Sequence, residues 1–158
     1  MHLSMYDAAY PPPDPPAFPV VAGYLGGDTP HVWTHTDWDS QPAELRLPIW
    51  VRSNPTSVDP AGDAYAAIAT VHDLQVPSGS TIALDVETAV HPGYVDTFNR
   101  LLGHEGYGVI LYGSASTVFN NPAPSQGYWV ADWTNTPHMF PGANATQYQQ
   151  TPPYDLSV

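Results

Sequence analysis

The chain has 158 residues and a formal net charge of −12, with three basic side chains against fifteen acidic ones. This length fits one domain over residues 1–158, and 42% hydrophobic residues support a packed core. An acidic surface repels phosphate backbones and anionic lipids, so neither nucleic acid nor a membrane is expected as a partner; a neutral polymer such as a glycan suits it better.

The N-terminal segment Met1-His2-Leu3-Ser4-Met5 has neither a basic region nor an apolar stretch, so no secretory signal is expected there. No apolar run approaches the ~20 residues of a membrane span. The absence of cysteine excludes disulfides and thiolate metal sites. Localisation stays open, with an extracellular or virion-associated protein as one possibility.

Short apolar segments separated by turn signals predict eight strands. In chain order they cover residues 3–8, 20–25, 47–52, 81–86, 108–112, 128–132, 145–149 and 154–158, the last two being the weakest. Between the first two lies the run Pro11-Pro12-Pro13-Asp14-Pro15-Pro16. Consecutive prolines cannot form helical hydrogen bonds, so this run is expected to be a stiff, extended connector.

Two segments have the apolar periodicity of a helix, residues 61–74 and 91–104. The first follows Asp59-Pro60, a typical N-cap with proline at the first helical position. Each helix lies between two apolar strands, a pattern that predicts right-handed crossovers and parallel pairing. The predicted fold is therefore α/β, a small or degenerate TIM-like (β/α) barrel with several helices missing.

The segment Ile82-Ala83-Leu84-Asp85-Val86-Glu87 ends a buried strand with two carboxylates at positions i and i+2. Such residues point to the same side of a strand, about 6.5 Å apart. Neighbouring carboxyl groups cannot both ionise freely, so one pKa should be raised. A proton donor beside a charge-stabilising carboxylate is the arrangement that glycoside hydrolysis requires. A surface turn or a metal site remains an alternative for this motif.

Catalytic groups of a (β/α) barrel lie at the carboxyl ends of its strands. Asp7, Asp85, Glu87 and Asp132 all lie at such ends of predicted strands. We therefore expect these four acids to line one cleft.

Ordered fragments of the chain resemble glycoside hydrolase family 25, the Chalaropsis-type lysozymes, and the related short glycoside-hydrolase-like domains of actinobacteria and their phages. The fragments are Met5-Tyr6-Asp7, Leu84-Asp85-Val86-Glu87, Gly106 to Gly113, Trp129-Val130-Ala131-Asp132-Trp133, Thr146-Gln147-Tyr148 and Tyr154-Asp155-Leu156. The chain departs from the family pattern at Thr146, where the family has Trp, and after Asp155, where the usual Asn is absent.

The resemblance implies cleavage of the muramyl-glucosaminyl bond of peptidoglycan, with Glu87 as the proton donor. Asp85 would polarise the acetamido group of the substrate or stabilise the oxocarbenium ion, and Asp7 and Asp155 would complete the acidic floor. Substrate contacts are expected from Asp132, Tyr112, Trp133, Tyr148 and Gln147. No cofactor or metal is implied.

Aromatic faces match the apolar faces of sugar rings. Stacking is expected for Trp133 and Tyr112, which lie at strand ends, and a core position for Trp50 and Trp129. His31 and His35 have the i, i+4 spacing of a helical metal-ligand pair. Their neighbours Pro30, Thr34 and Thr36 favour a loop instead. Ser114 lacks the Gly-x-Ser-x-Gly elbow of a serine hydrolase.

Three functions remain open. The first is a peptidoglycan-cleaving muramidase. The second is a glycan-binding or structural module, such as a virion or cell-surface component, that keeps the barrel without turnover. The third is an unrelated α/β enzyme with Mg²⁺ or Ca²⁺ on Asp85 and Glu87. Because the polyproline run replaces a barrel helix, the flank beside the first two strands is expected to be exposed and to contact another protein or another copy of the chain.

Overall fold

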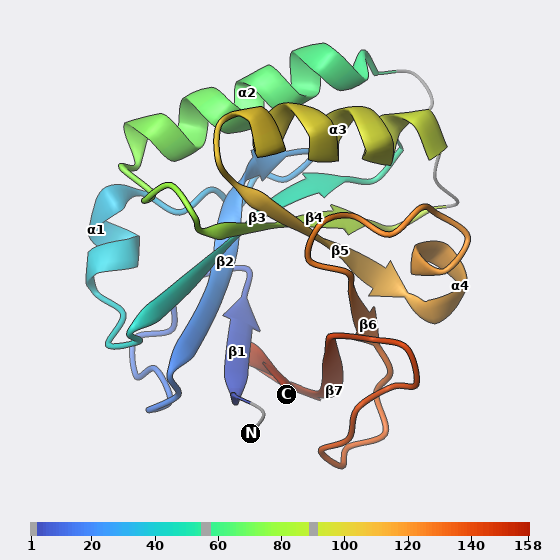
Figure 1. Ribbon diagram of the computed structural model, residues 1–158. Helices are drawn as coiled ribbons and strands as arrows, with labels where there is room; N and C mark the ends of the chain where they lie inside the picture. The colour runs from blue at the N-terminus through green and yellow to red at the C-terminus, as the bar shows by residue number, and fades with distance from the viewer. Residues whose placement is uncertain (1–2, 55–57, 89–91) are drawn as a thin grey trace.

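In the computed structural model of the chain, residues 3–54, 58–88 and 92–158 are described, and their strands close into an eight-stranded barrel (Figure 1). The fold is thus the small TIM-like barrel that the sequence predicts. The strands are β1 Met5–Ala8, β2 Val20–Gly27, β3 Leu45–Arg52, β4 Thr81–Val86, β5 Gly108–Ser114, β6 Tyr128–Ala131, β7 Ala145–Thr151 and β8 Tyr154–Ser157.

Neighbouring strands pair in parallel from β1 to β7, whereas β8 runs antiparallel to both β7 and β1. The end of the chain therefore enters the barrel in the reverse direction. As a consequence, the first residues of β8 lie at the same rim as the carboxyl ends of the parallel strands.

Four helices are present in the described residues, and two of them are long: α1 His35–Asp39, α2 Pro60–Asp73, α3 Pro92–His104 and α4 Ala115–Val118. The side chain of Asp59 accepts hydrogen bonds from the backbone N–H groups of Ala61 and Gly62, each at 3.1 Å, and caps α2 as predicted. The predicted start of the second helix at His91 lies outside the described residues. The helices α1 and α4 were not predicted, because each is too short to show a periodic pattern.

The two long helices lie side by side over β3, β4 and β5 (Figure 1), and α2 also contacts β2. After α3, the described part of the chain forms only one further helix, the short α4. The apolar faces of the two long helices and the outer sides of the covered strands form the largest apolar cluster, in which Phe98, Leu102 and Ile82 are fully buried. A second cluster fills the barrel interior around Ile49, Ala83 and Trp129. None of the helices in the described ranges is long and apolar enough to span a membrane.

The flank beside β1 and β2 is covered, so the prediction that this flank is exposed is wrong. Residues 11–16 form neither helix nor strand, as predicted, but two indole rings take the place of the missing helix. Trp33 and Trp38 pack on the outer side chains of Tyr6 and Val21, which are fully buried. Both rings come from the connection between β2 and β3, which has no regular sequence pattern.

The indole of Trp33 rests on Gly23 of β2. A Cβ atom at position 23 would lie 2.6 Å from ring atoms of Trp33, which is too close for any side chain. We expect Gly23→Ala to lower the free energy of unfolding by roughly 1–3 kcal/mol, the usual cost of overpacking. Urea denaturation checks this, with Gly103→Ala as the control, because a Cβ at the helical position 103 meets no atom within 4 Å.

Candidate functional site

Three acidic side chains meet at the rim formed by the carboxyl ends of the parallel strands. Asp7 lies on β1 and pairs in register with Asp155 of the antiparallel β8. Asp85 lies on β4, and its carboxyl group interacts electrostatically with that of Asp7. The reversed direction of β8 is what places Asp155 here, near the beginning of its strand rather than at its end.

Gln147 of β7 connects two of these acids. Its side-chain amide donates to both carboxylate oxygens of Asp7 at 3.1 Å and to Oδ2 of Asp155 at 3.4 Å. Burial raises the pKa of Asp7 to about 7, although the hydrogen bond from Gln147 opposes the rise and the charge of Asp155 adds to it. Burial also raises the pKa of Asp155.

Asp85 is a buried acid of this group, and it differs from Asp7 and Asp155 in accepting no hydrogen bond from Gln147. It is 5% exposed, and its carboxyl group makes no hydrogen bond to the described residues. Burial raises its pKa to about 8, and the nearby charges of Glu87 and Asp7 add to the rise. The carboxyl group of Asp85 is therefore largely protonated at neutral pH.

Glu87 follows β4 directly and is exposed, one alternation beyond Asp85. Its negative charge raises the pKa of Asp85 and the pKa of the Tyr24 phenol. The pair thus combines a buried, neutral carboxyl group with an accessible one, as the Asp-x-Glu spacing predicts.

Tyr24 of β2 also belongs to this site, although it is not among the predicted site residues. Its pKa is raised mainly by burial and then by the charges of Asp85, Asp7, Glu87 and Asp155, so its hydroxyl group lies among all of the acids. The signal in the sequence is the alternation Ala22-x-Tyr24 on β2, which turns Tyr24 into the barrel beyond the interior residue Ala22.

An aromatic group borders the acids. The hydroxyl of Tyr112 donates to Oε1 of Gln147 at 2.9 Å, and the indole Nε1 of Trp133 donates to the same atom at 2.7 Å. The ring of Tyr112 packs on that of Trp129, with ring centroids 4.2 Å apart. Trp133 is 54% exposed while its N–H is held by Gln147, so it presents a fixed aromatic face to solvent.

Two predicted substrate contacts are buried. Gln147 is 1% exposed and uses both ends of its amide inside the protein, and the ring of Tyr148 is also buried. Both side chains therefore lie beneath the protein surface and support the residues that a ligand would contact. Trp50 and Trp129 are core residues, as predicted.

Asp132 lies at the same rim, one residue beyond β6, but its carboxylate pairs with His138. The Asp132 Oδ2 to His138 Nε2 distance is 3.0 Å, and both side chains are partly exposed. Hydrogen bonds to the backbone of Thr136 and to Asp132 raise the pKa of His138. Asp132 thus belongs to the loop that carries Trp133 and is tied to a histidine rather than to the other acids.

The two histidines at positions 31 and 35 do not share a helix. His35 is the first residue of α1, whose N-cap is Thr34, whereas His31 precedes the helix and contacts Tyr10. The expected loop is therefore correct for His31 and wrong for His35. Among the described residues, no group of three or more His, Asp or Glu side chains could hold a metal ion.

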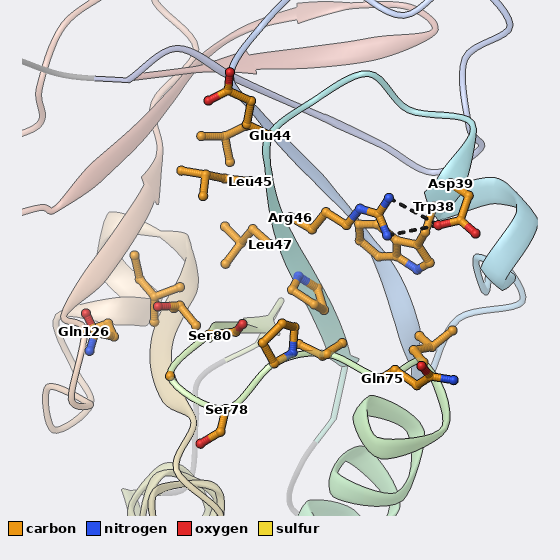
Figure 2. Close-up of a pocket in the computed structure, with 18 of the residues that line it drawn as sticks. Trp38, Asp39, Glu44, Leu45, Arg46, Leu47, Gln75, Ser78, Ser80 and Gln126 are labelled. Carbon is orange, nitrogen blue, oxygen red and sulfur yellow. Dashed lines mark hydrogen bonds and ion pairs between the residues drawn. The ribbon is translucent and has the colours of Figure 1, made fainter.

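A large cavity lies at the opposite end of the barrel. It has a volume of 1170 Å³ and surrounds the beginning of β3, between the Trp38 side of α1 and the segment 74–80 (Figure 2). The ion pair of Arg46 with Asp39 forms part of its wall. None of the acids at the carboxyl-end rim lines this cavity, so its presence does not identify the site.

Gln147→Met should lower the free energy of unfolding and leave the side chains of Tyr112 and Trp133 less fixed. Methionine has a similar volume but leaves the Tyr112 hydroxyl and the Trp133 indole without their acceptor. Unpaired polar groups in a buried network cost roughly 2–4 kcal/mol in total. Chemical denaturation measures the loss. Gln150→Met, on the exposed part of the same strand, is the matched control and should change stability by less than about 0.5 kcal/mol.

No known protein-family profile matches the chain. No curated protein sequence matches it either. Solved structures do match over almost the whole chain. An uncharacterized protein of B. stearothermophilus superposes with a TM-score of 0.75 at 15% identity, covering 99% of this chain and 95% of the other.

Two further structures carry functional descriptions. The catalytic domain of endolysin ply40, from bacteriophage P40 of Listeria monocytogenes, has a TM-score of 0.69 at 14% identity, covering 100% of this chain and 93% of the other. A glycosyl hydrolase 25 of Streptococcus pneumoniae has a TM-score of 0.64 at 12% identity, covering 87% and 74%. The chain has a glycoside hydrolase 25-like fold. At these identities the likeness establishes the fold alone.

Proposed function

We propose that the protein is a peptidoglycan-directed glycoside hydrolase of the muramidase type, with its active site at the carboxyl-end rim. The observation that carries the proposal is the pairing of buried Asp85, whose pKa burial raises, with accessible Glu87 beside a fixed aromatic face, Trp133. Two carboxyl groups in different environments are what acid-assisted glycoside cleavage uses. The endolysin and glycosyl hydrolase 25 neighbours support a cell-wall glycan as the substrate class.

In this proposal Glu87 donates a proton to the oxygen of the leaving sugar, because it is the accessible member of the pair. The positive charge that develops on the cleaved sugar faces the floor formed by Asp85, Asp7 and Asp155, and it shifts these carboxyl groups toward their ionised form. As carboxylates they stabilise an oxocarbenium-like transition state electrostatically. A water molecule then adds to the sugar carbon and returns a proton to Glu87. Asp85 also presents a hydroxyl donor or a carboxylate acceptor to the acetamido group of the substrate, according to its protonation. Trp133 supplies a stacking surface for a neighbouring sugar ring.

The direct test is incubation of the purified protein with insoluble peptidoglycan from several bacteria, measuring both the fraction of protein bound and the loss of turbidity. The proposal expects binding followed by a fall in turbidity. Binding without any fall would instead support the glycan-binding module. Absence of both binding and clearing in every cell wall tested would remove peptidoglycan as the ligand.

A further inference from the structure

We infer that Arg52 is a positioning residue for Glu87, acting through Ser53 and Thr88; the inference rests on the proposed function of the rim. Arg52 is the last residue of β3, next to β4 in the barrel. It lies at the rim that carries the acids, but none of the predicted site motifs contains it. Its side chain is only 12% exposed.

The guanidinium group joins two carboxylates from different parts of the chain. It is paired with both oxygens of Asp63 on α2, with Nε donating to Oδ2 at 2.9 Å, and with Oδ1 of Asp28, which follows β2. The planar fork of arginine can bind Asp63 through two parallel N–H groups and still donate to Asp28, whereas the ammonium group of lysine cannot form the bidentate pair. The end of β3 is therefore fixed to α2 and to the end of β2 together.

Asp63 makes this junction rigid. It is buried and also accepts hydrogen bonds from the indole Nε1 of Trp50 at 3.1 Å and from the hydroxyl of Tyr94 on α3. The carboxylate, which lies on α2, thus has donors on β3 and on α3. A buried network whose members are all satisfied holds a single arrangement.

The junction reaches the segment that carries Glu87. The second oxygen of Asp28 accepts from the backbone N–H of Ser53 at 3.1 Å, so the residue after Arg52 is held in place. The carbonyl oxygen of Ser53 in turn accepts a hydrogen bond from Oγ1 of Thr88 at 2.6 Å. Thr88 is the residue directly after Glu87, at the point where the chain has already left β4.

Glu87 itself is exposed, and its carboxyl group makes electrostatic interactions but no hydrogen bond to the residues that the structure describes. Its backbone is held on one side by β4 and on the other by the Thr88 hydrogen bond. A proton donor must lie within hydrogen-bond reach of the leaving oxygen, and small displacements of a catalytic group slow the reaction strongly. The Arg52 junction therefore fixes the direction in which Glu87 enters the site.

The test compares Thr88→Val, which removes the hydroxyl with little change of shape, with Thr88→Ser, which keeps it. For Thr88→Val we expect kcat on cell-wall substrate to fall roughly tenfold with KM unchanged. The backbone NMR order parameter of Glu87 should fall from about 0.85 toward about 0.6. Thr88→Ser should restore both values. Arg52→Lys should reproduce the loss of order, provided that it folds.

The control is Thr70→Val on α2, which removes a hydroxyl that donates to a backbone carbonyl at 3.0 Å far from the rim. It should leave kcat and the order parameter of Glu87 unchanged. An unchanged order parameter in Thr88→Val would overturn the inference, whatever the activity. If the unaltered protein does not cleave peptidoglycan, the proposed function fails, but the order parameters still decide whether the junction holds Glu87.

Discussion

Glu87→Gln should abolish cell-wall hydrolysis while leaving the thermal midpoint of unfolding nearly unchanged. Glutamine keeps the shape of the side chain but cannot donate the proton that the leaving sugar needs. Loss of general acid catalysis lowers rates by a factor on the order of 10²–10⁴. Because Glu87 is exposed and makes no hydrogen bond to the described residues, its replacement should cost little stability. Release of soluble muropeptides and differential scanning calorimetry measure the two quantities.

The matched control is Glu44→Gln, an exposed carboxylate at the opposite end of the barrel. It makes the same change in net charge, so it reports any general effect of charge on binding to the cell wall. Its activity should equal that of the unaltered protein. A fully active Glu87→Gln variant would show that another group donates the proton, and Asp85, which is protonated at neutral pH, would be the first candidate.

Asp85→Asn should separate stability from function in a pH-dependent way. The pKa of Asp85 rises from 3.8 to about 8 on folding, chiefly through burial. Between these two values the folded protein keeps a proton that the unfolded chain has released. The free energy of unfolding therefore falls as the pH rises through this range. Asparagine cannot ionise, so the variant escapes this loss.

We expect the thermal midpoint of Asp85→Asn, relative to the unaltered protein, to increase between pH 5 and pH 9. Three pH units at about 1.4 kcal/mol each give a differential effect of about 4 kcal/mol, which corresponds to a shift on the order of 10 °C for a chain of this size. Activity should fall at the same time, because in the proposed function this carboxyl group faces the reacting sugar. Calorimetry at four pH values is sufficient. A relative midpoint that does not change with pH would show that Asp85 ionises normally in the folded protein.

A higher free energy of unfolding in Asp85→Asn would also indicate that this carboxyl group is kept for function rather than for stability. A carboxyl group whose pKa burial raises is costly to ionise in a folded protein, and such groups persist mainly where they serve a function. The same substitution at Asp63 should act in the opposite direction, because that carboxylate is paired with Arg52 and receives donors from Trp50 and Tyr94.

The barrel could be predicted because its signals are local. Asp59 and Pro60 mark the beginning of α2, and apolar runs that end in Asp7 or Asp85 mark strands and their rim. The direction of β8 was not predicted, although the sequence carries its signal. A parallel partner requires a long crossover, and only the two residues Pro152 and Pro153 separate β7 from β8, so the turn compels antiparallel pairing.

The other differences between the sequence predictions and the structure concern contacts between distant segments. Whether Asp132 faces the acids or His138 depends on the path of the loop after β6, which no periodicity describes. Gln147 and Tyr148 match a family motif, but a motif does not show that both side chains are buried. The two indole rings over β1 and β2 likewise come from a segment with no regular pattern.

The identity of the new reducing ends tests the central claim most directly. Peptidoglycan should be digested with the unaltered protein and with Glu87→Gln in parallel, the products reduced with borohydride, and the terminal sugars identified by mass spectrometry. Cleavage of the muramyl-glucosaminyl bond predicts reduced N-acetylmuramic acid in the first digest and none in the second. Reduced N-acetylglucosamine as the terminal sugar, or equal amounts of product from both proteins, would contradict the account.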